Sequence, residues 1–193
     1  MATYLTAIWR CRYFWLSMVR MDLRTRYSRS VLGVGWSLLQ PLAMTLIICI
    51  VFHQLFDLNI REYCTFLLMG LCFWNYVITV VINGCQCLFL GESYIRQYPA
   101  PLAIYPLRTV LGGLFHFLIS LVVVLLMQWY LNGPGNLVVL PWSLLAIVYL
   151  AIFGWAVAVL AGFATAFLPD TRHISEVGLQ LVFYGTPIIY PPE

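Results

Sequence analysis

The chain has 193 residues, of which 63% are hydrophobic and 9% are charged, and its formal net charge is +3. Soluble domains carry about 45–50% apolar and about 25% charged residues, so the composition argues against a soluble fold and predicts an integral membrane protein. All ten basic residues are arginines, and six of them precede the first long apolar segment. This placement is typical of membrane orientation and headgroup contact, and it argues against nucleic-acid binding.

Residues 1–30 are predicted to form an amphipathic helix on the cytoplasmic leaflet. At about 100° per residue, one face collects apolar side chains, namely Leu5, Ile8, Trp9, Trp15, Leu16, Val19 and Leu23. We expect the membrane interface to be contacted by Arg10, Arg20, Arg24, Arg26 and Arg29. Arg12 falls inside the apolar stripe and weakens the pattern. A short entry helix packed against its own protein is the alternative, and the two interpretations do not exclude each other.

Residues 31–193 are predicted to form the transmembrane domain. Their long uncharged runs meet the need of about 20 apolar residues per helical span. The Asn-Gly-Pro-Gly-Asn turn at 132–136 divides one run that is too long for a single span. Continuous apolar runs favour helices over barrel strands, so the fold class is an all-α integral membrane protein with about five transmembrane helices. The spans are expected at about 32–56, 63–90, 107–131, 137–168 and 175–190.

The distribution of arginines predicts the orientation of the spans. With the N-terminus in the cytoplasm, the inner segments 1–31, 91–108 and 169–176 hold nine of the ten arginines, and only Arg61 lies outside. Cytoplasmic connections are the ones enriched in Lys and Arg. We therefore expect a multi-pass protein of the bacterial inner membrane with a cytoplasmic N-terminus.

Small residues recur on one face of the fourth span. Gly154, Ala158 and Gly162 are spaced by four residues, which predicts close contact with another helix. The six cysteines are interpreted as small hydrophobic side chains, because several lie in apolar runs and no metal-binding spacing accompanies them. They are Cys11, Cys49, Cys64, Cys72, Cys85 and Cys87.

Polar and aromatic residues inside the spans are candidates for a substrate path. His53 and His116 have no acidic partner in a neighbouring span, so neutral, hydrogen-bonded histidines are favoured over a proton relay. Amides either line a path or bond between helices, and they are Gln40, Asn75, Asn83, Gln86 and Gln128. Aromatic rings near span ends either anchor the chain at the interface or stack on sugars. The candidate path residues are Trp36, Trp74, Tyr184 and Tyr190.

Catalysis is not expected on this chain. It has no lysine, so a phosphate-binding G-x-x-x-x-G-K-[ST] loop cannot exist, and nucleotide-driven work requires a partner. Asp170, His173 and Glu176 are close in sequence, but a hydrolytic or metal site there is disfavoured. We predict a protein that is not an enzyme and binds no cofactor or metal.

Several short blocks of the sequence occur together in one known family. They lie at 22–27, 30–33, 36–42, 68–71, 74–75, 83–84, 92–96, 170–173 and 183–191. With them the chain resembles the ABC-2 type transporter permeases, especially the polysaccharide, O-antigen and teichoic-acid exporters. The likeness covers nearly the whole chain.

The resemblance implies a homodimer of six-span permeases that moves polysaccharide or lipid-linked glycan across the inner membrane. It also implies two separate ATPase subunits, which carry the ATP and Mg and bind at a cytoplasmic coupling loop. The counterpart of this loop is 91–106, with Glu92, Tyr94, Arg96 and Tyr98 as the coupling residues. The chain ends at Glu193, before the family's re-entrant helices and sixth span, so we expect a truncated form.

Three other functions remain as alternatives. A secondary transporter would need coupled ionisable groups or broken helices in matched halves, and the spans offer few of these. A membrane-embedded transferase would need a carboxylate or histidine constellation near one surface, which only 170–176 approaches. A non-catalytic membrane subunit is the third.

Overall fold

The computed structural model describes residues 2–28, 33–56, 60–98, 100–133 and 139–188. These residues form helices and no strand. The elements are α1 (Ala2–Arg10), α2 (Arg12–Tyr27), the short 3-10 helix η1 (Gly33–Gly35), α3 (Trp36–Phe56), α4 (Ile60–Leu90), α5 (Glu92–Gln97), α6 (Ile104–Asn132), α7 (Val139–Phe167) and α8 (Thr171–Gly185).

Three segments of the described chain are long and apolar enough to cross a membrane. They are Tyr63–Gln97, Ile104–Tyr130 and Ser143–Phe167, and Trp36–Val51 is a shorter apolar helix. The predicted class of all-α membrane protein is thereby confirmed. The predicted fifth span, 175–190, overlaps α8, and its crossing of the membrane stays a prediction.

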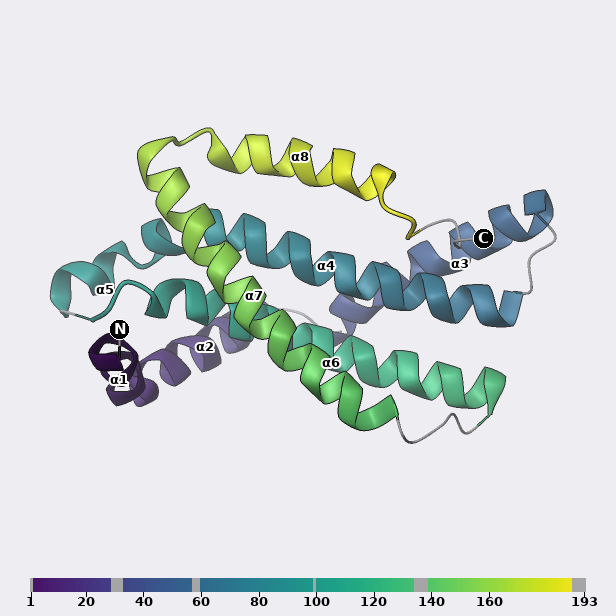
Figure 1. The fold of residues 1–193 in the computed structure, drawn as a ribbon, viewed down its shortest axis with the longest axis horizontal. Helices are drawn as coiled ribbons and strands as arrows, with labels where there is room; N and C mark the ends of the chain where they lie inside the picture. Colours follow the sequence, from purple (N-terminus) through teal and green to yellow (C-terminus); the bar gives the residue numbers. More distant parts are fainter. Residues whose placement is uncertain (1, 29–32, 57–59, 99, 134–138, 189–193) are drawn as a thin grey trace.

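The helix α4 is the centre of the bundle. It packs against α3, α6, α7 and α8, and α7 crosses both α4 and α6 diagonally (Figure 1). At this crossing Ala158 is fully buried, and a Cβ on Gly84 of α4 would lie 3.0 Å from the Ala158 Cα. A Cβ on Gly162 would lie 2.9 Å from the Cys87 Sγ, and one on Gly154 would lie 2.4 Å from the Tyr76 Oη. The predicted close contact along the small face of α7 is confirmed.

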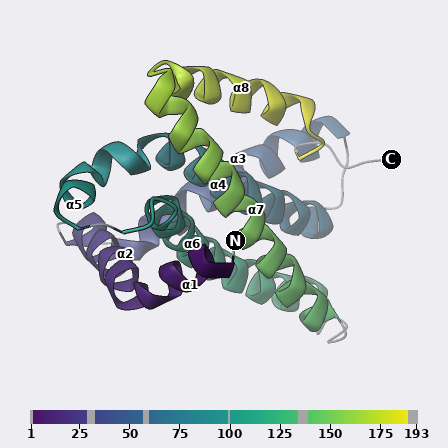
Figure 2. The same cartoon turned by 60° about the vertical axis from the view of Figure 1, so that its left-hand side comes forward.

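The ends of the helices fall into two groups. Figure 1 shows α1, α2, α5 and the start of α8 at one end of the bundle, and Figure 2 shows α1, α2 and α5 together from a second direction. The end of α3, the start of α4, the end of α6 and the start of α7 lie at the opposite end (Figure 1). The segments with the most arginines therefore share one end. Which side of the membrane this end faces stays a prediction.

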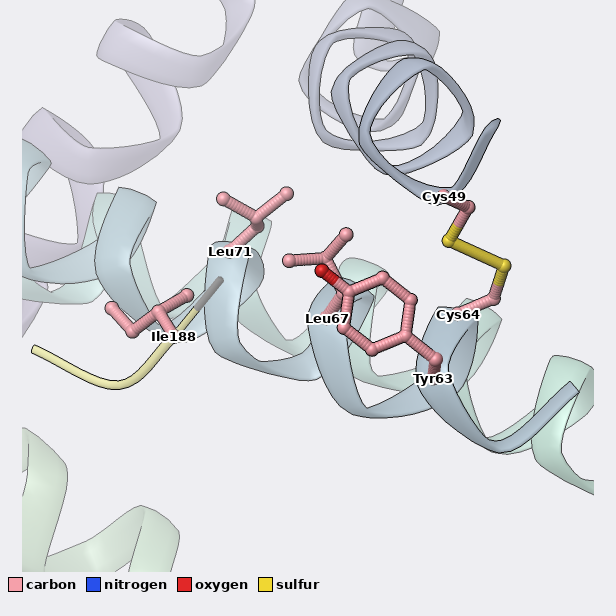
Figure 3. Close-up of a cluster of buried hydrophobic side chains, with 6 residues drawn as sticks. All are labelled: Cys49, Tyr63, Cys64, Leu67, Leu71 and Ile188. Atoms are coloured by element: carbon pink, nitrogen blue, oxygen red, sulfur yellow. A yellow bond between two sulfur atoms is a disulfide. The ribbon is translucent and has the colours of Figure 1, made fainter. Parts of the chain in front are cut away.

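The interpretation of all six cysteines as simple hydrophobic residues is wrong for one pair. Cys49 of α3 and Cys64 of α4 form a disulfide, with their Cα atoms 6.1 Å apart (Figure 3). That separation lies within the range of disulfides. The pair belongs to one buried cluster with Tyr63, Leu67, Leu71 and Ile188. Two cysteines on different helices carry no sequence signal of their pairing, because it depends on how α3 and α4 pack. The other four cysteines are free.

The N-terminal segment is two helices that meet at Cys11, where one was predicted. Ile8, Met18 and Val19 are buried against the protein, whereas Leu5 and Trp9 of the predicted apolar face are exposed. The segment therefore packs on its own protein and also presents apolar side chains outward. The Arg12 guanidinium lies over the rings of Trp9 and Tyr13, at 5.8 and 4.8 Å from their centroids, which accommodates its charge within the stripe.

Candidate functional site: a groove beside α8 and the α5 segment

A groove runs between α3, α4 and α8, with a cavity volume of about 320 Å³. This volume lies at the lower end of the range of small-molecule sites. Figure 1 shows α8 lying along α4, and α4 also contacts α3. The groove brings together Trp74 and Tyr184, two of the four predicted path residues.

Aromatic rings form one part of the groove wall. The Trp74 and Phe183 rings lie 5.5 Å apart between centroids, and Phe183 lies 5.6 Å from Tyr184. These separations are typical of aromatic pairs in contact. Phe183 was not predicted as a path residue, because the face that α8 turns toward α4 is set by packing.

Amides form the polar part of the same wall. Gln40 of α3, Asn75 of α4 and Gln180 of α8 all line the groove, together with the carboxylate of Glu176. Gln40 and Asn75 were predicted from the sequence as possible path residues, whereas Gln180 and the groove position of Glu176 were not. A signal for both was present, since Glu176, Gln180 and Tyr184 follow each other at intervals of four residues and therefore share one helix face.

A second cavity, of about 590 Å³, adjoins this groove at Gln40, which lines both. It is also lined by Arg26 of α2 and by Trp36, Ser37 and Leu39 of α3. Trp36, a predicted path residue, thus lies in the neighbouring cavity. The remaining path residue, Tyr190, lies outside the described residues.

The other polar candidates lie elsewhere. Asn83, Gln86 and Gln128 line neither cavity. His116 is half-buried in α6, with its ring 5.6 Å from that of Phe115. The side chain of His53 lies outside the described part of the chain.

The predicted coupling residues divide into two pairs. Glu92 and Arg96 form a salt bridge of 2.6 Å on α5, and their side chains are 57% and 77% exposed. Tyr94 and Tyr98 lie against Phe14 of α2, with centroid distances of 6.1 and 5.8 Å. The charged pair is therefore accessible to a partner, whereas the two tyrosines pack the α5 segment against α2.

The arginines predicted for the membrane interface remain largely accessible. Arg10, Arg20, Arg24 and Arg26 are exposed, and Arg29 lies outside the described residues. The helix α2 is held in place by a different pair, because Arg108 at the start of α6 donates two hydrogen bonds to the carboxylate of Asp22. Trp155 of α7 adds a further link at this end, since its Nε1 donates to the Ala103 carbonyl at 3.0 Å.

Three curated proteins are similar to the chain. It is 29% identical over 173 residues to the O-antigen export system permease protein RfbA of Klebsiella pneumoniae. The matched segment covers 89% of this chain and 66% of that protein. A protein of the same name from Myxococcus xanthus is 27% identical over 185 residues, covering 95% of this chain and 70% of that protein. The chain resembles O-antigen export permeases. The resemblance predicted from the sequence is thereby confirmed.

A second Klebsiella pneumoniae permease of that name is 27% identical over 172 residues, covering 89% of this chain and 66% of that protein. The chain therefore spans slightly less than two thirds of the length of both Klebsiella O-antigen export permeases. All three similar proteins are named as transport permeases. No protein-family model matches the chain.

Proposed function

We propose that this chain acts as the permease subunit of an ATP-driven exporter that moves polysaccharide or lipid-linked glycan across the bacterial inner membrane. The observation that carries the proposal is the groove between α3, α4 and α8, where aromatic rings and amides meet. The similarity to O-antigen export permeases supports the same class of cargo.

The chemistry of the groove suits sugars. The faces of Trp74 and Tyr184 offer flat, apolar surfaces with a negative quadrupole, against which the C–H faces of sugar rings can stack. The amides of Gln40, Asn75 and Gln180 each supply donors and an acceptor for hydroxyl groups. A groove open on one side encloses a polymer only when a second wall covers it, and in the proposed homodimer a second copy of the chain supplies that wall.

The energy for transport comes from a partner in this proposal. A separate ATPase binds ATP and Mg, because this sequence lacks the lysine of a phosphate loop. The ATPase docks on the exposed Glu92–Arg96 pair of α5. The contacts of Tyr94 and Tyr98 with Phe14 transmit the movement of α5 to α2. The N-terminus and α5 face the cytoplasm, as the arginine distribution predicts.

The test is glycan export by variants of Trp74 in a cell whose own permease gene has been deleted. Trp74→Ala should abolish or strongly reduce glycan at the cell surface, whereas Trp74→Phe, which keeps an aromatic face, should retain most of it. Trp129→Ala is the control, because Trp129 is an exposed aromatic residue that lines neither cavity. Membrane levels of each variant are measured by immunoblot. Normal export by a stably inserted Trp74→Ala variant would refute the groove as the substrate path.

A further inference from the structure

The described lining of the groove contains a single charged side chain, and it is an acid. Around Glu176 the lining consists of amides, aromatic rings and apolar residues, and no arginine belongs to it. The neighbouring cavity differs in this respect, because Arg26 lines it. A ligand in the groove therefore meets uncharged hydrogen-bonding groups and one carboxylate.

The carboxylate of Glu176 is oriented by two neighbours on its own helix. Arg172 donates from Nε to Oε1 at 3.0 Å, and the Nδ1 of His173 lies 3.5 Å from Oε2. Neither Arg172 nor His173 lines the groove, and the Glu176 side chain is 41% exposed. Glu176 thus faces the groove while its cationic partner lies one turn away, outside the lining.

Resting on the proposed function, we infer that the groove selects uncharged glycan segments and rejects acidic ones through Glu176. A uronic acid that lies in the groove beside Glu176 brings a second carboxylate toward it, with no cation in the described lining to pair with it, and the juxtaposition of like charges disfavours binding. An uncharged sugar makes the same stacking and amide contacts without this repulsion. The substrate class is therefore a neutral polysaccharide.

The inference is tested by binding of two defined hexasaccharides to the full chain in lipid nanodiscs. Maltohexaose is the uncharged probe and hexagalacturonate is the acidic one, and isothermal titration calorimetry measures binding. We expect hexagalacturonate to bind about tenfold more weakly than maltohexaose at low ionic strength. The difference should shrink as salt is raised, because the partly exposed carboxylate is screened. Trp74→Ala should weaken both probes, which assigns the signal to the groove.

Charge variants of α8 provide the decisive comparison. Glu176→Gln removes the carboxylate and leaves Arg172 without its partner beside the groove, so hexagalacturonate should bind at least as tightly as maltohexaose. Arg172→Gln leaves Glu176 uncompensated and should widen the difference between the probes. Asp170→Asn is the matched control, because it removes a carboxylate from the same end of α8 without touching the groove lining.

Two outcomes separate the inference from the function on which it rests. Equal binding of both probes to the unaltered chain, or no effect of Glu176→Gln on hexagalacturonate, would overturn the neutral-glycan selectivity while the groove keeps its role in transport. Failure of both probes to bind at any concentration tested would overturn the selectivity and the groove assignment together.

Discussion

Replacement of Gly84 by alanine should weaken the packing of α4 against α7. A Cβ built on Gly84 would lie 3.0 Å from the Cα of Ala158, 3.2 Å from its Cβ and 3.3 Å from its carbonyl oxygen. Two of these three atoms belong to the backbone of α7, so no side-chain rotation can relieve the contact. The two helices must move apart, and the neighbouring close approach of Gly162 to α4 would loosen with them.

The magnitude follows from two opposing terms. In a helix interior, alanine raises the free energy of unfolding by about 1 kcal/mol relative to glycine. Overpacking a well-packed contact lowers the free energy of unfolding by about 1–3 kcal/mol. Gly112 of α6 provides the matched control, because a Cβ there meets nothing within 4 Å in the described structure. Gly112→Ala should therefore show the propensity gain alone. The difference between the two variants isolates the clash, and it should be about 1–3 kcal/mol.

The assay is reversible unfolding of the full chain in mixed micelles, followed by circular dichroism as the denaturing detergent is increased. Both variants are compared with the unaltered chain under the same lipid and detergent conditions. A Gly84→Ala variant as stable as Gly112→Ala would refute the packing of α4 on α7 at this position. The result would also remove the physical basis for the small-residue face of α7.

Three further predictions follow from other contacts. Arg96→Glu on the exposed face of α5 should leave the free energy of unfolding unchanged and reduce co-purification with the ATPase of the same export system. Undiminished co-purification would contradict docking of the ATPase at the Glu92–Arg96 pair. Tyr105→Phe should leave the free energy of unfolding unchanged or raise it, because the buried Tyr105 hydroxyl has no hydrogen-bond partner among the described residues. Tyr76→Phe should lower the free energy of unfolding by about 1 kcal/mol, because the Tyr76 hydroxyl loses its hydrogen bond to a backbone carbonyl of α7. The reverse order of the two variants in unfolding experiments would refute both assignments. The disulfide between Cys49 and Cys64 leaves four of the six cysteines reactive toward a maleimide in the denatured, unreduced chain, and six labels by mass spectrometry would contradict it.

The long helices could be predicted from the sequence because their determinants are local. An uncharged apolar run of sufficient length forms a helix in a membrane regardless of how the other helices pack around it. The reason is that every backbone N–H and C=O group must be hydrogen-bonded within the segment. The third predicted span, 107–131, corresponds to α6 at Ile104–Asn132, and the fourth, 137–168, corresponds to α7 at Val139–Phe167. The small face of α7 was predictable for the same reason, because it needs only the spacing of its residues.

The environment of an apolar side chain could not be predicted in the same way. Periodicity shows that Leu5, Ile8 and Trp9 share a helix face, but both a protein interior and a lipid surface accept such a face. In the structure Ile8 is buried, whereas Leu5 and Trp9 are exposed. The break at Cys11 changes the direction of the chain between α1 and α2, so a single helical wheel over 1–30 cannot describe both.

The groove shows why the start of α8 matters for function. From the sequence, 169–176 was predicted to be a cytoplasmic segment and the fifth span was expected to begin only at about 175, so Arg172 was not placed on the helix that carries Gln180 and Tyr184. In the structure α8 begins at Thr171, so Arg172, Glu176, Gln180 and Tyr184 belong to one helix and recur at intervals of four residues. Such residues form a single stripe, which passes from an ion pair through an amide to an aromatic ring. The polar character of the groove lining therefore changes along α8, and its charged residue, Glu176, lies in the first half of this helix, which begins at the end of the bundle that also carries α1, α2 and α5.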